Sequence, residues 1–312
     1  MRTAQIIRRF AFSEWGGTES VVWNTARALQ EKGNPSEIFA TRALSSVQDE
    51  VKNSIRIHRL HYRYPRFPLS KEKIRTLDKK GGNPVVPGLQ KALRKGEFDI
   101  LHCHTMGRMA VTVRAAAKQM HVPYIMTLHG GYFDVPPAEL RQMIKPLKGS
   151  IPYGKIIDRL LGRRVDALKL ANGIVCVGEN EFQPAKEHFP DKPIIHLPNG
   201  VNYDYFHDYD GSDFRRQAGI PQDRKVVLCV SRIDYQKNQL ALVELLAVRP
   251  DCRLTLVGPI TANWYAEKIQ ARVRELGVGD RFTLVSGLPP DSAELAAAFA
   301  AADIFVLISF AR

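Results

Sequence analysis

The stretch Val226-Val-Leu-Cys-Val-Ser-Arg-Ile-Asp-Tyr-Gln-Lys-Asn238 decides the fold expected for this chain. Residues 226–230 form a short and almost entirely apolar run, which is typical of a strand covered on both faces in a parallel sheet. A loop with Arg232 and Lys237 follows, and apolar residues at helical spacing come after it. Strand, loop and helix in this order indicate one βα unit of a doubly wound sheet.

The two cations of that loop, Arg232 and Lys237, are the first candidate site. In open α/β sheets, ligands bind in the crevice outside the carboxyl ends of the strands. Two fixed positive charges beside the free N–H groups of a helix start would suit a diphosphate. Solvated surface charges explain the same spacing equally well, so the residues alone leave both interpretations open.

Further βα units are expected on both sides of this stretch. In the second half, the pattern predicts strands at 226–232, 254–258, 282–286 and 304–308 and helices at 238–248, 262–276 and 291–302. In the first half, it predicts strands at 5–12, 36–41, 54–60, 98–105, 122–128, 173–178 and 194–197 and helices from 18 or 19 to 32 and at 108–120, 153–171 and 181–188. Such repeats predict parallel, doubly wound sheets, and 312 residues suit two domains, 1–198 and 199–312.

Two segments of the first half are expected to be irregular. The basic stretch after Leu60 contains several prolines, and residues 132–152 are expected to form a lid over an acceptor. The helix predicted at 153–171 has an apolar and a basic side. It either lies on a membrane surface or packs on the sheet.

The charge of the chain is unevenly distributed. Residues 1–198 contain 32 Lys and Arg against 18 Asp and Glu, whereas residues 199–312 contain 13 against 14. An anionic partner for the first half would explain this asymmetry, although a merely solvated basic face explains it too. No nucleic-acid-binding motif accompanies the charge, so a membrane or an anionic glycolipid is the favoured partner.

The cysteines predict no redox or metal chemistry. All four lie in or beside apolar runs without a CxxC pair, which predicts buried free thiols. His102-Cys103-His104 ends a predicted strand, and alternate strand residues face opposite sides. Cys103 should therefore point away from both histidines, and we expect no metal site.

Two glycine pairs mark further candidate residues. Gly16 and Gly17 precede a predicted helix, where backbone N–H groups can approach an anion, but a tight turn explains the pair as well. Trp15 beside them would serve as a sugar-stacking platform or as a buried loop anchor. His129 ends a predicted strand before Gly130-Gly131, where it would touch a substrate or serve a structural role.

An ordered set of motifs spans almost the whole chain. It consists of W-G-G-T-E from Trp15, L-H-G-G at 128–131, L-P-N-G-V at 197–201, S-R-I-D-Y-Q-K-N at 231–238, L-V-G at 256–258 and V-S-G-L-P at 285–289. This set resembles the retaining, GT-B-type glycosyltransferases of group 1, the family that includes glycogen and sucrose synthases. The resemblance implies two Rossmann-like domains facing a central cleft, with the acceptor side in the first and the nucleotide-sugar donor side in the second.

The resemblance also implies a role for each candidate residue. Arg232 and Lys237 would clamp the donor diphosphate with Gly16 and Gly17, and His129 would be the catalytic residue beside the donor sugar. The nucleotide would lie against Gly258, Gly287 and Leu288, and Trp15 and Glu19 would lie on the acceptor side.

The family continues after the strand at 304–308 with an acidic E-x7-E element that is not found before Arg312. The resemblance therefore predicts an incomplete second domain.

The expected function is metal-independent transfer of a sugar, with retention, from a nucleotide-diphosphate donor to a glycan or lipid-linked acceptor, without a cofactor. A cytoplasmic enzyme of cell-surface polysaccharide or lipopolysaccharide synthesis, peripheral on the inner membrane face, fits this expectation. One alternative is a non-catalytic remnant that binds nucleotide or an anionic membrane surface. The other is a sugar-nucleotide epimerase of the same fold.

Overall fold

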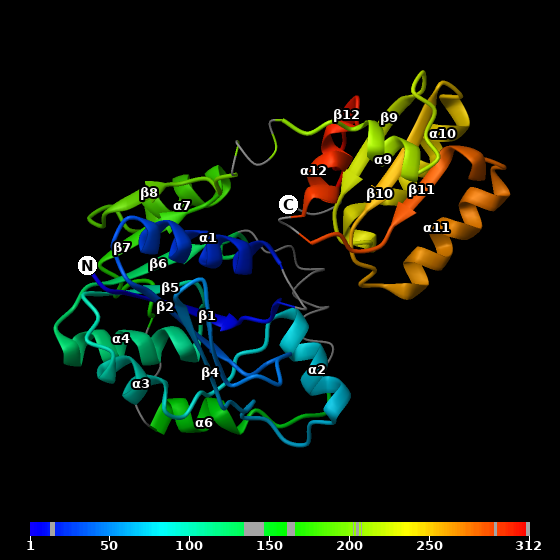
Figure 1. The fold of residues 1–312 in the computed structure, drawn as a ribbon. Helices are drawn as coiled ribbons and strands as arrows, with labels where there is room; N and C mark the ends of the chain where they lie inside the picture. The colour runs from blue at the N-terminus through cyan, green and yellow to red at the C-terminus, as the bar shows by residue number, and fades with distance from the viewer. Residues whose placement is uncertain are drawn as a thin grey trace. The chain divides into compact units, whose positions relative to one another are not determined.

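The computed structural model describes residues 1–12, 16–133, 147–160, 166–201, 203, 206, 208–289 and 292–309. The chain divides into two compact units, Met1–Gly200 and Val201–Arg312. The boundary predicted from the sequence, 198/199, lies close to this division. Each unit is a sheet with helices on both faces (Figure 1). The α/β class with parallel sheets is thereby confirmed.

Unit 1 contains an eight-stranded sheet in the order β3-β4-β2-β1-β5-β6-β7-β8. Its strands are β1 (Thr3–Arg9), β2 (Ser36–Thr41), β3 (Asp49–Lys52), β4 (Ile55–Leu60), β5 (Ile100–Cys103), β6 (Tyr124–Leu128), β7 (Gly173–Cys176) and β8 (Ile194–His196). All pairs are parallel except β3 with β4. Because β2 and β5 flank β1 on opposite sides, the order of the strands reverses at β1 and β5, where α/β folds bind ligands.

The helices of unit 1 cover both faces of its sheet. They are α1 (Gly17–Glu31), α2 (Lys71–Lys80), α3 (Leu89–Lys95), α4 (Arg108–Met120), α6 (Tyr153–Leu160) and α7 (Glu179–His188). Figure 1 shows α1 and α7 on one face and α3 and α4 on the other. Along β1 the side chains alternate: Ile6 packs in the cluster that holds α4, whereas Ile7 packs in the cluster that holds α1.

Unit 2 contains a fully parallel four-stranded sheet in the order β11-β10-β9-β12. Its elements are α9 (Ser212–Gln217), β9 (Lys225–Val230), α10 (Gln239–Val248), β10 (Cys252–Val257), α11 (Asn263–Glu275), β11 (Phe282–Val285), α12 (Ala293–Ala300) and β12 (Ile304–Phe305), with short 3-10 helices η3 (Tyr235–Lys237) and η4 (Gly279–Arg281). Val227 and Cys229 of β9 pack with α10 and α11, whereas Val226 and Leu228 pack with α9 and α12. The prediction of a strand covered on both faces is confirmed.

The expectation of an irregular stretch after Leu60 was wrong, because α2 and α3 lie within it. Ser70 begins α2, and its Oγ accepts the N–H of Lys73 at 3.2 Å. This helix is strongly polar, with Leu77 as its buried apolar residue, so it lacks the apolar periodicity by which helices are predicted. The signal for this helix in the sequence was the capping residue Ser70 and not an apolar period.

The predicted helix at 153–171 was also wrong in its length. Helix α6 is described over Tyr153–Leu160, residues 161–165 lie outside the described residues, and residues 167–170 form a turn. There the carboxylate of Asp166 accepts the N–H groups of Leu168 and Lys169 at 3.0 and 3.1 Å. A side chain that bonds to the backbone in this way competes with a continuous helix. The short elements β3 and α9 were not predicted.

Candidate functional site

The loop after β9 carries Arg232 and Lys237 at the point where the strand order of unit 2 reverses. Strands β10 and β12 flank β9 on opposite sides, so a crevice at their carboxyl ends is expected there. Lys237 Nζ donates to Ser309 Oγ, which follows β12, at 3.4 Å. Among the described residues, neither Arg232 nor Lys237 pairs with a carboxylate. The charge of both cations is therefore available to an anion.

Buried polar contacts fix the shape of this loop. Gln239 is fully buried, and its Nε2 donates to Ser231 Oγ at 3.0 Å and to the carbonyl oxygen of Arg232 at 2.8 Å. Asp234 accepts the N–H of Gln236 at 3.1 Å and the hydroxyl of Thr261 at 3.2 Å. These contacts present Arg232 at the surface on a loop that is anchored on both sides.

The helix start at α10 differs from the expectation of free N–H groups. The hydroxyl of Tyr265 accepts the N–H of Leu240 at 3.1 Å, so this donor is already used. Tyr265 is buried on α11 and was not considered as a partner. Arg232 and Lys237 themselves, rather than a full set of helix donors, are the main positive features of the site.

The glycines near this loop serve different purposes. Gly258 has a φ of +149°, and a Cβ there would lie 2.0 Å from the carbonyl oxygen of Ser231. Only glycine therefore lets the chain after β10 pass the loop that carries Arg232. Gly287 has a φ of +74° and is exposed with open space around it, and Leu288 packs against the cluster of α9 and α12.

In unit 1, Gly16 and Gly17 begin α1 directly after the loop from β1. No side chain caps α1. A Cβ on Gly16 would lie 2.8 Å from Glu19 Oε2, whereas Gly17 is exposed with open space around it. Glu19 is 4% exposed and forms an ion pair with Arg9 at 3.0 Å, so its carboxylate ties the first turn of α1 to the end of β1. Trp15 lies outside the described residues.

His129 lies at the carboxyl end of β6 and contacts a second histidine. Its Nε2 lies 3.0 Å from Nδ1 of His104, and Nε2 of His104 lies 2.8 Å from Oε1 of Gln5. Burial lowers the pKa of His129 to about 4 and lowers the pKa of His104 well below its ordinary value. Both rings are therefore neutral at neutral pH.

The loop after His129 is held by a buried carboxylate. Glu181, in the first turn of α7, accepts the N–H of Gly130 at 2.8 Å and that of Tyr132 at 3.1 Å. Glu181 is 2% exposed. Sequence reasoning missed Gln5, His104, Glu181 and Gln239 as site residues. Gln5 and Gln239 are polar residues among buried apolar ones, which is a signal in the sequence, whereas Glu181 gives none because acidic residues are common in the first turn of a helix.

The strand alternation predicted for His102-Cys103-His104 is confirmed. The rings of His102 and His104 lie on the same side of β5, 4.1 Å apart, whereas Cys103 is buried in the cluster on the α4 face. All four cysteines are free and buried, as predicted.

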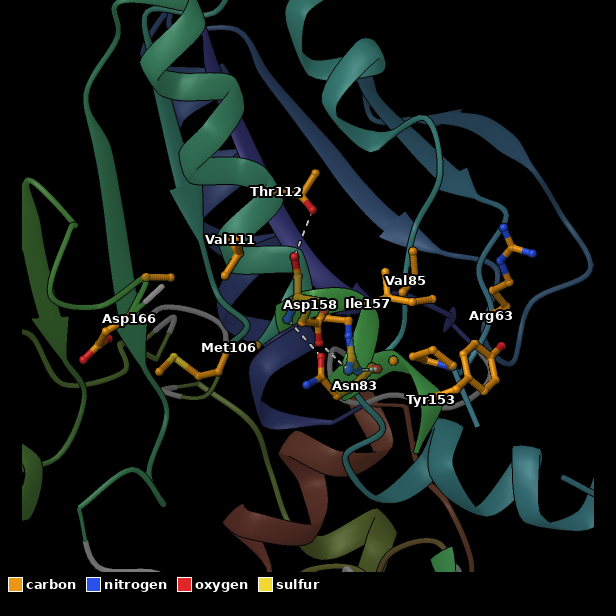
Figure 2. A pocket seen from close by; sticks show the side chains of 15 residues that line it. Arg63, Asn83, Val85, Met106, Val111, Thr112, Tyr153, Ile157, Asp158 and Asp166 are labelled. Carbon is orange, nitrogen blue, oxygen red and sulfur yellow. Dashed lines mark hydrogen bonds and ion pairs between the residues drawn. The ribbon is translucent and has the colours of Figure 1, made fainter. Parts of the chain in front are cut away.

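A pocket of about 650 Å³ lies within unit 1 near the N-terminal end of α4 (Figure 2). Asn83 Oδ1 accepts the N–H of Arg108 at 2.9 Å, and Arg108 forms an ion pair with Asp158 of α6 at 2.6 Å. Figure 2 shows Arg63 and Asp166 at opposite ends of the pocket. Arg63 is exposed and makes no side-chain hydrogen bond or ion pair within the described ranges. The remaining lining residues are largely apolar, including Val85, Met106, Val111 and Ile157.

Comparison with known proteins identifies the family. The model of Glycosyltransferase Family 4 matches residues 15–205, and that of Glycosyl transferases group 1 matches residues 210–311. The chain belongs to Glycosyltransferase Family 4, and its second unit matches the group 1 glycosyl transferases.

Two curated glycosyltransferases are similar to the chain. A D-inositol 3-phosphate glycosyltransferase of Acidothermus cellulolyticus is 25% identical over 88% of this chain and 62% of its own length. A GDP-mannose-dependent alpha-(1-6)-phosphatidylinositol monomannoside mannosyltransferase of Mycolicibacterium smegmatis is 36% identical over 38% of this chain and 31% of its own length. The chain thus spans less than two thirds of either relative.

Solved structures share the fold of this chain. Sucrose-phosphate synthase from Thermosynechococcus elongatus superposes with a TM-score of 0.67 at 19% identity, covering 99% of this chain and 75% of that one. Anabaena HepE in complex with UDP and glucose gives a TM-score of 0.64 at 15% identity, covering 99% and 74%. The predicted GT-B fold is confirmed.

Proposed function

We propose that this glycosyltransferase moves a hexose from a nucleotide-diphosphate sugar to a glycan or lipid-linked acceptor, with retention and without a metal ion. The observation that carries the proposal is the anchored loop of unit 2, where Arg232 and Lys237 have no carboxylate partner among the described residues. Two cations of this kind suit the diphosphate of the donor and would stabilise it as it leaves. HepE, with its bound UDP and glucose, supports a nucleotide sugar as donor.

His129, Gly16 and Gly17 are proposed to act on the same reaction from unit 1. His129 is neutral and would contact the sugar, whereas the uncapped start of α1 would add partial positive charge near the phosphates. The backbone at Gly287 and Leu288 is proposed to contact the base. Trp15 is proposed to lie on the acceptor side, while Glu19 would act there only by holding the glycine loop through Arg9.

The acceptor is proposed to be anionic and to use the pocket beside α4. The guanidinium of Arg63, which has no side-chain partner among the described residues, would attract a phosphate, and the apolar wall would accommodate the less polar part of the acceptor. The relatives are named for D-inositol 3-phosphate and phosphatidylinositol monomannoside, and both compounds carry a phosphate on an inositol ring. An acceptor of this class, or a lipid-linked precursor of a polysaccharide or lipopolysaccharide, fits the basic character of unit 1.

Contact with the inner face of an anionic membrane is proposed to occur through α6. Ile156, Ile157 and Leu160 are 61%, 43% and 80% exposed, and Arg159 is exposed beside them. Exposed apolar and basic side chains on one short helix suit the interface of an anionic bilayer. Among the helices that the structure describes, none is long and apolar enough to cross a membrane.

A donor panel tests the proposed reaction. Purified protein is incubated with UDP-, GDP- and ADP-sugars, with and without phosphoinositol or lipid-linked acceptors, and the released nucleotide is measured. We expect acceptor-dependent release that persists in EDTA and an α-linked product from an α-linked donor. Loss of transfer in EDTA, or a product of inverted configuration, would contradict the corresponding part of the proposal. A converted donor sugar without acceptor would indicate an epimerase, and nucleotide binding without turnover would indicate a non-catalytic protein.

A further inference from the structure

Three polar side chains from adjacent strands form a hydrogen-bonded chain that leads out of the core of unit 1. Gln5 of β1 is 1% exposed, His104 after β5 is 6% exposed, and His129 after β6 is half-buried. The two contacts between them measure 2.8 and 3.0 Å. The chain therefore connects the buried amide of Gln5 to the ring of the proposed catalytic histidine.

The chemistry of these groups determines where the protons lie. The amide oxygen of Gln5 can only accept a hydrogen bond, so Nε2 of His104 must carry its proton. A neutral imidazole has a single N–H, and Nδ1 of His104 is consequently an acceptor. Nε2 of His129 must then donate to it, which leaves Nδ1 of His129 without a proton.

We infer that Gln5 and His104 are positioning residues that hold His129 in the Nε2–H tautomer, so that its Nδ1 is presented as an uncharged hydrogen-bond acceptor. Within the described part of the chain, no group uses this nitrogen. An uncharged acceptor binds a hydroxyl in preference to a carboxylate or a fully ionised phosphate, because these anions offer no proton. The second part of the inference rests on the proposed function: the group that His129 receives is a hydroxyl of a sugar.

Neighbouring contacts fix the orientation of the chain. The ring of His102 lies 4.1 Å from that of His104, and its Nε2 contacts the hydroxyl of Thr127 at 2.6 Å. Beyond His129, Glu181 holds the next N–H groups of the backbone. The ring of His129 is thus constrained from the interior by His104 and along the chain by Glu181. Contacts on both sides keep the ring of His129 in one orientation, and a fixed orientation favours a single tautomer.

Nuclear magnetic resonance of protein labelled with ¹⁵N-histidine tests the tautomers without any substrate. The signals are assigned with His104→Asn and His129→Asn, and two-bond couplings show which ring nitrogen carries the proton. We expect both His104 and His129 in the Nε2–H form at pH 7.5. A wild-type His129 in the Nδ1–H form would overturn the inference, because it would mean that Gln5 donates through its amide nitrogen.

Two substitutions at Gln5 test causation. Gln5→Met removes the acceptor at similar size, and a second tautomer of His104 and His129 should become detectable. Gln5→Glu should also change the pattern, because a buried neutral acid would donate to Nε2 of His104 and a carboxylate would favour a doubly protonated ring. Thr127→Val is the control, since it removes a hydrogen bond from the adjacent His102 but leaves the chain intact. Unchanged tautomers in a folded Gln5→Met protein would refute the positioning role.

Activity provides a separate measurement. In Gln5→Met, turnover of the nucleotide sugar should fall about tenfold, the size expected for losing one hydrogen bond, while the affinity for free nucleoside diphosphate stays the same. Turnover equal to wild type would refute the link to the sugar hydroxyl. If the tautomers are as expected but no sugar is transferred by the wild-type protein, the proposed function fails while the hydrogen-bonded chain stands.

Discussion

Removing either cation of the loop after β9 should weaken nucleotide binding without unfolding the protein. Among the described residues, the exposed side chain of Arg232 has no partner, and the side chain of Lys237 makes one contact, of 3.4 Å to Ser309 Oγ. Surface substitutions of this kind change stability by less than about 0.5 kcal/mol. A charge-assisted contact to a phosphate contributes about 1.5–3 kcal/mol, so each alanine variant should bind a nucleoside diphosphate roughly 10- to 150-fold more weakly.

Calorimetry with a nucleoside diphosphate and the matching nucleoside separates the two parts of the ligand. The nucleoside lacks phosphates, so Arg232→Ala, Lys237→Ala and wild type should bind it alike. Arg274→Ala and Lys268→Ala, which remove exposed cations of α11, are the matched controls and should leave both affinities unchanged. Equal losses for nucleoside and diphosphate would show a general disturbance of the site. Unchanged affinity in both loop variants would refute the diphosphate assignment.

Three further outcomes are expected. Gly258→Ala should lower the free energy of unfolding by at least about 3 kcal/mol, because the added Cβ would overlap the carbonyl oxygen of Ser231. Gly287→Ala should lower it by only about 1–2 kcal/mol, because the added Cβ meets open space and only the positive φ is unfavourable. Urea denaturation of the two variants measures both effects. Burial lowers the pKa of His102 and of His129 from 6.5 to about 4, so the unfolded chain binds more protons than the folded protein between these pH values. The contribution of these two groups to the free energy of unfolding should be constant above pH 7 and should fall as the pH drops from about 6.5 to 4. Urea denaturation at pH 7.5 and at pH 5 measures this change, and a higher stability at pH 5 would contradict the prediction. Burial raises the pKa of Cys103 to about 12 and that of Cys176 to about 11, so both thiols should react with Ellman's reagent at pH 8 only after unfolding, and rapid reaction of the native protein would contradict their burial.

The local order of elements was predictable where side-chain periodicity and glycine positions agree. Residues 226–230 are apolar at every position because β9 packs against helices on both faces, and this pattern is visible without coordinates. The opposite orientation of Cys103 and its neighbouring histidines follows from the period of a strand in the same way. Helix α2 was missed because a polar helix has capping signals but little apolar periodicity.

Arg232, Lys237 and His129 were singled out from motifs, whereas the residues that contact them were not. A sequence motif shows which residue lies at the end of a strand, because the position of a residue within a strand depends on the local sequence. Gln5 and His104 are 99 residues apart in the chain and become neighbours only because β1 pairs with β5. Glu181 likewise reaches the loop of Gly130 only because β6 pairs with β7, which places α7 beside it.

The sequence by itself therefore determined the α/β class, the family and the residues that bear charge or imidazole at strand ends. Only the tertiary structure decided the protonation pattern of His129 and the reason for glycine at position 258. Both depend on distances between atoms of strands that are remote in sequence: the amide of Gln5 against His104, and the carbonyl of Ser231 against the chain after β10. Hydrogen bonding and steric exclusion act over a few ångströms, so they are decided by sheet pairing and not by order along the chain.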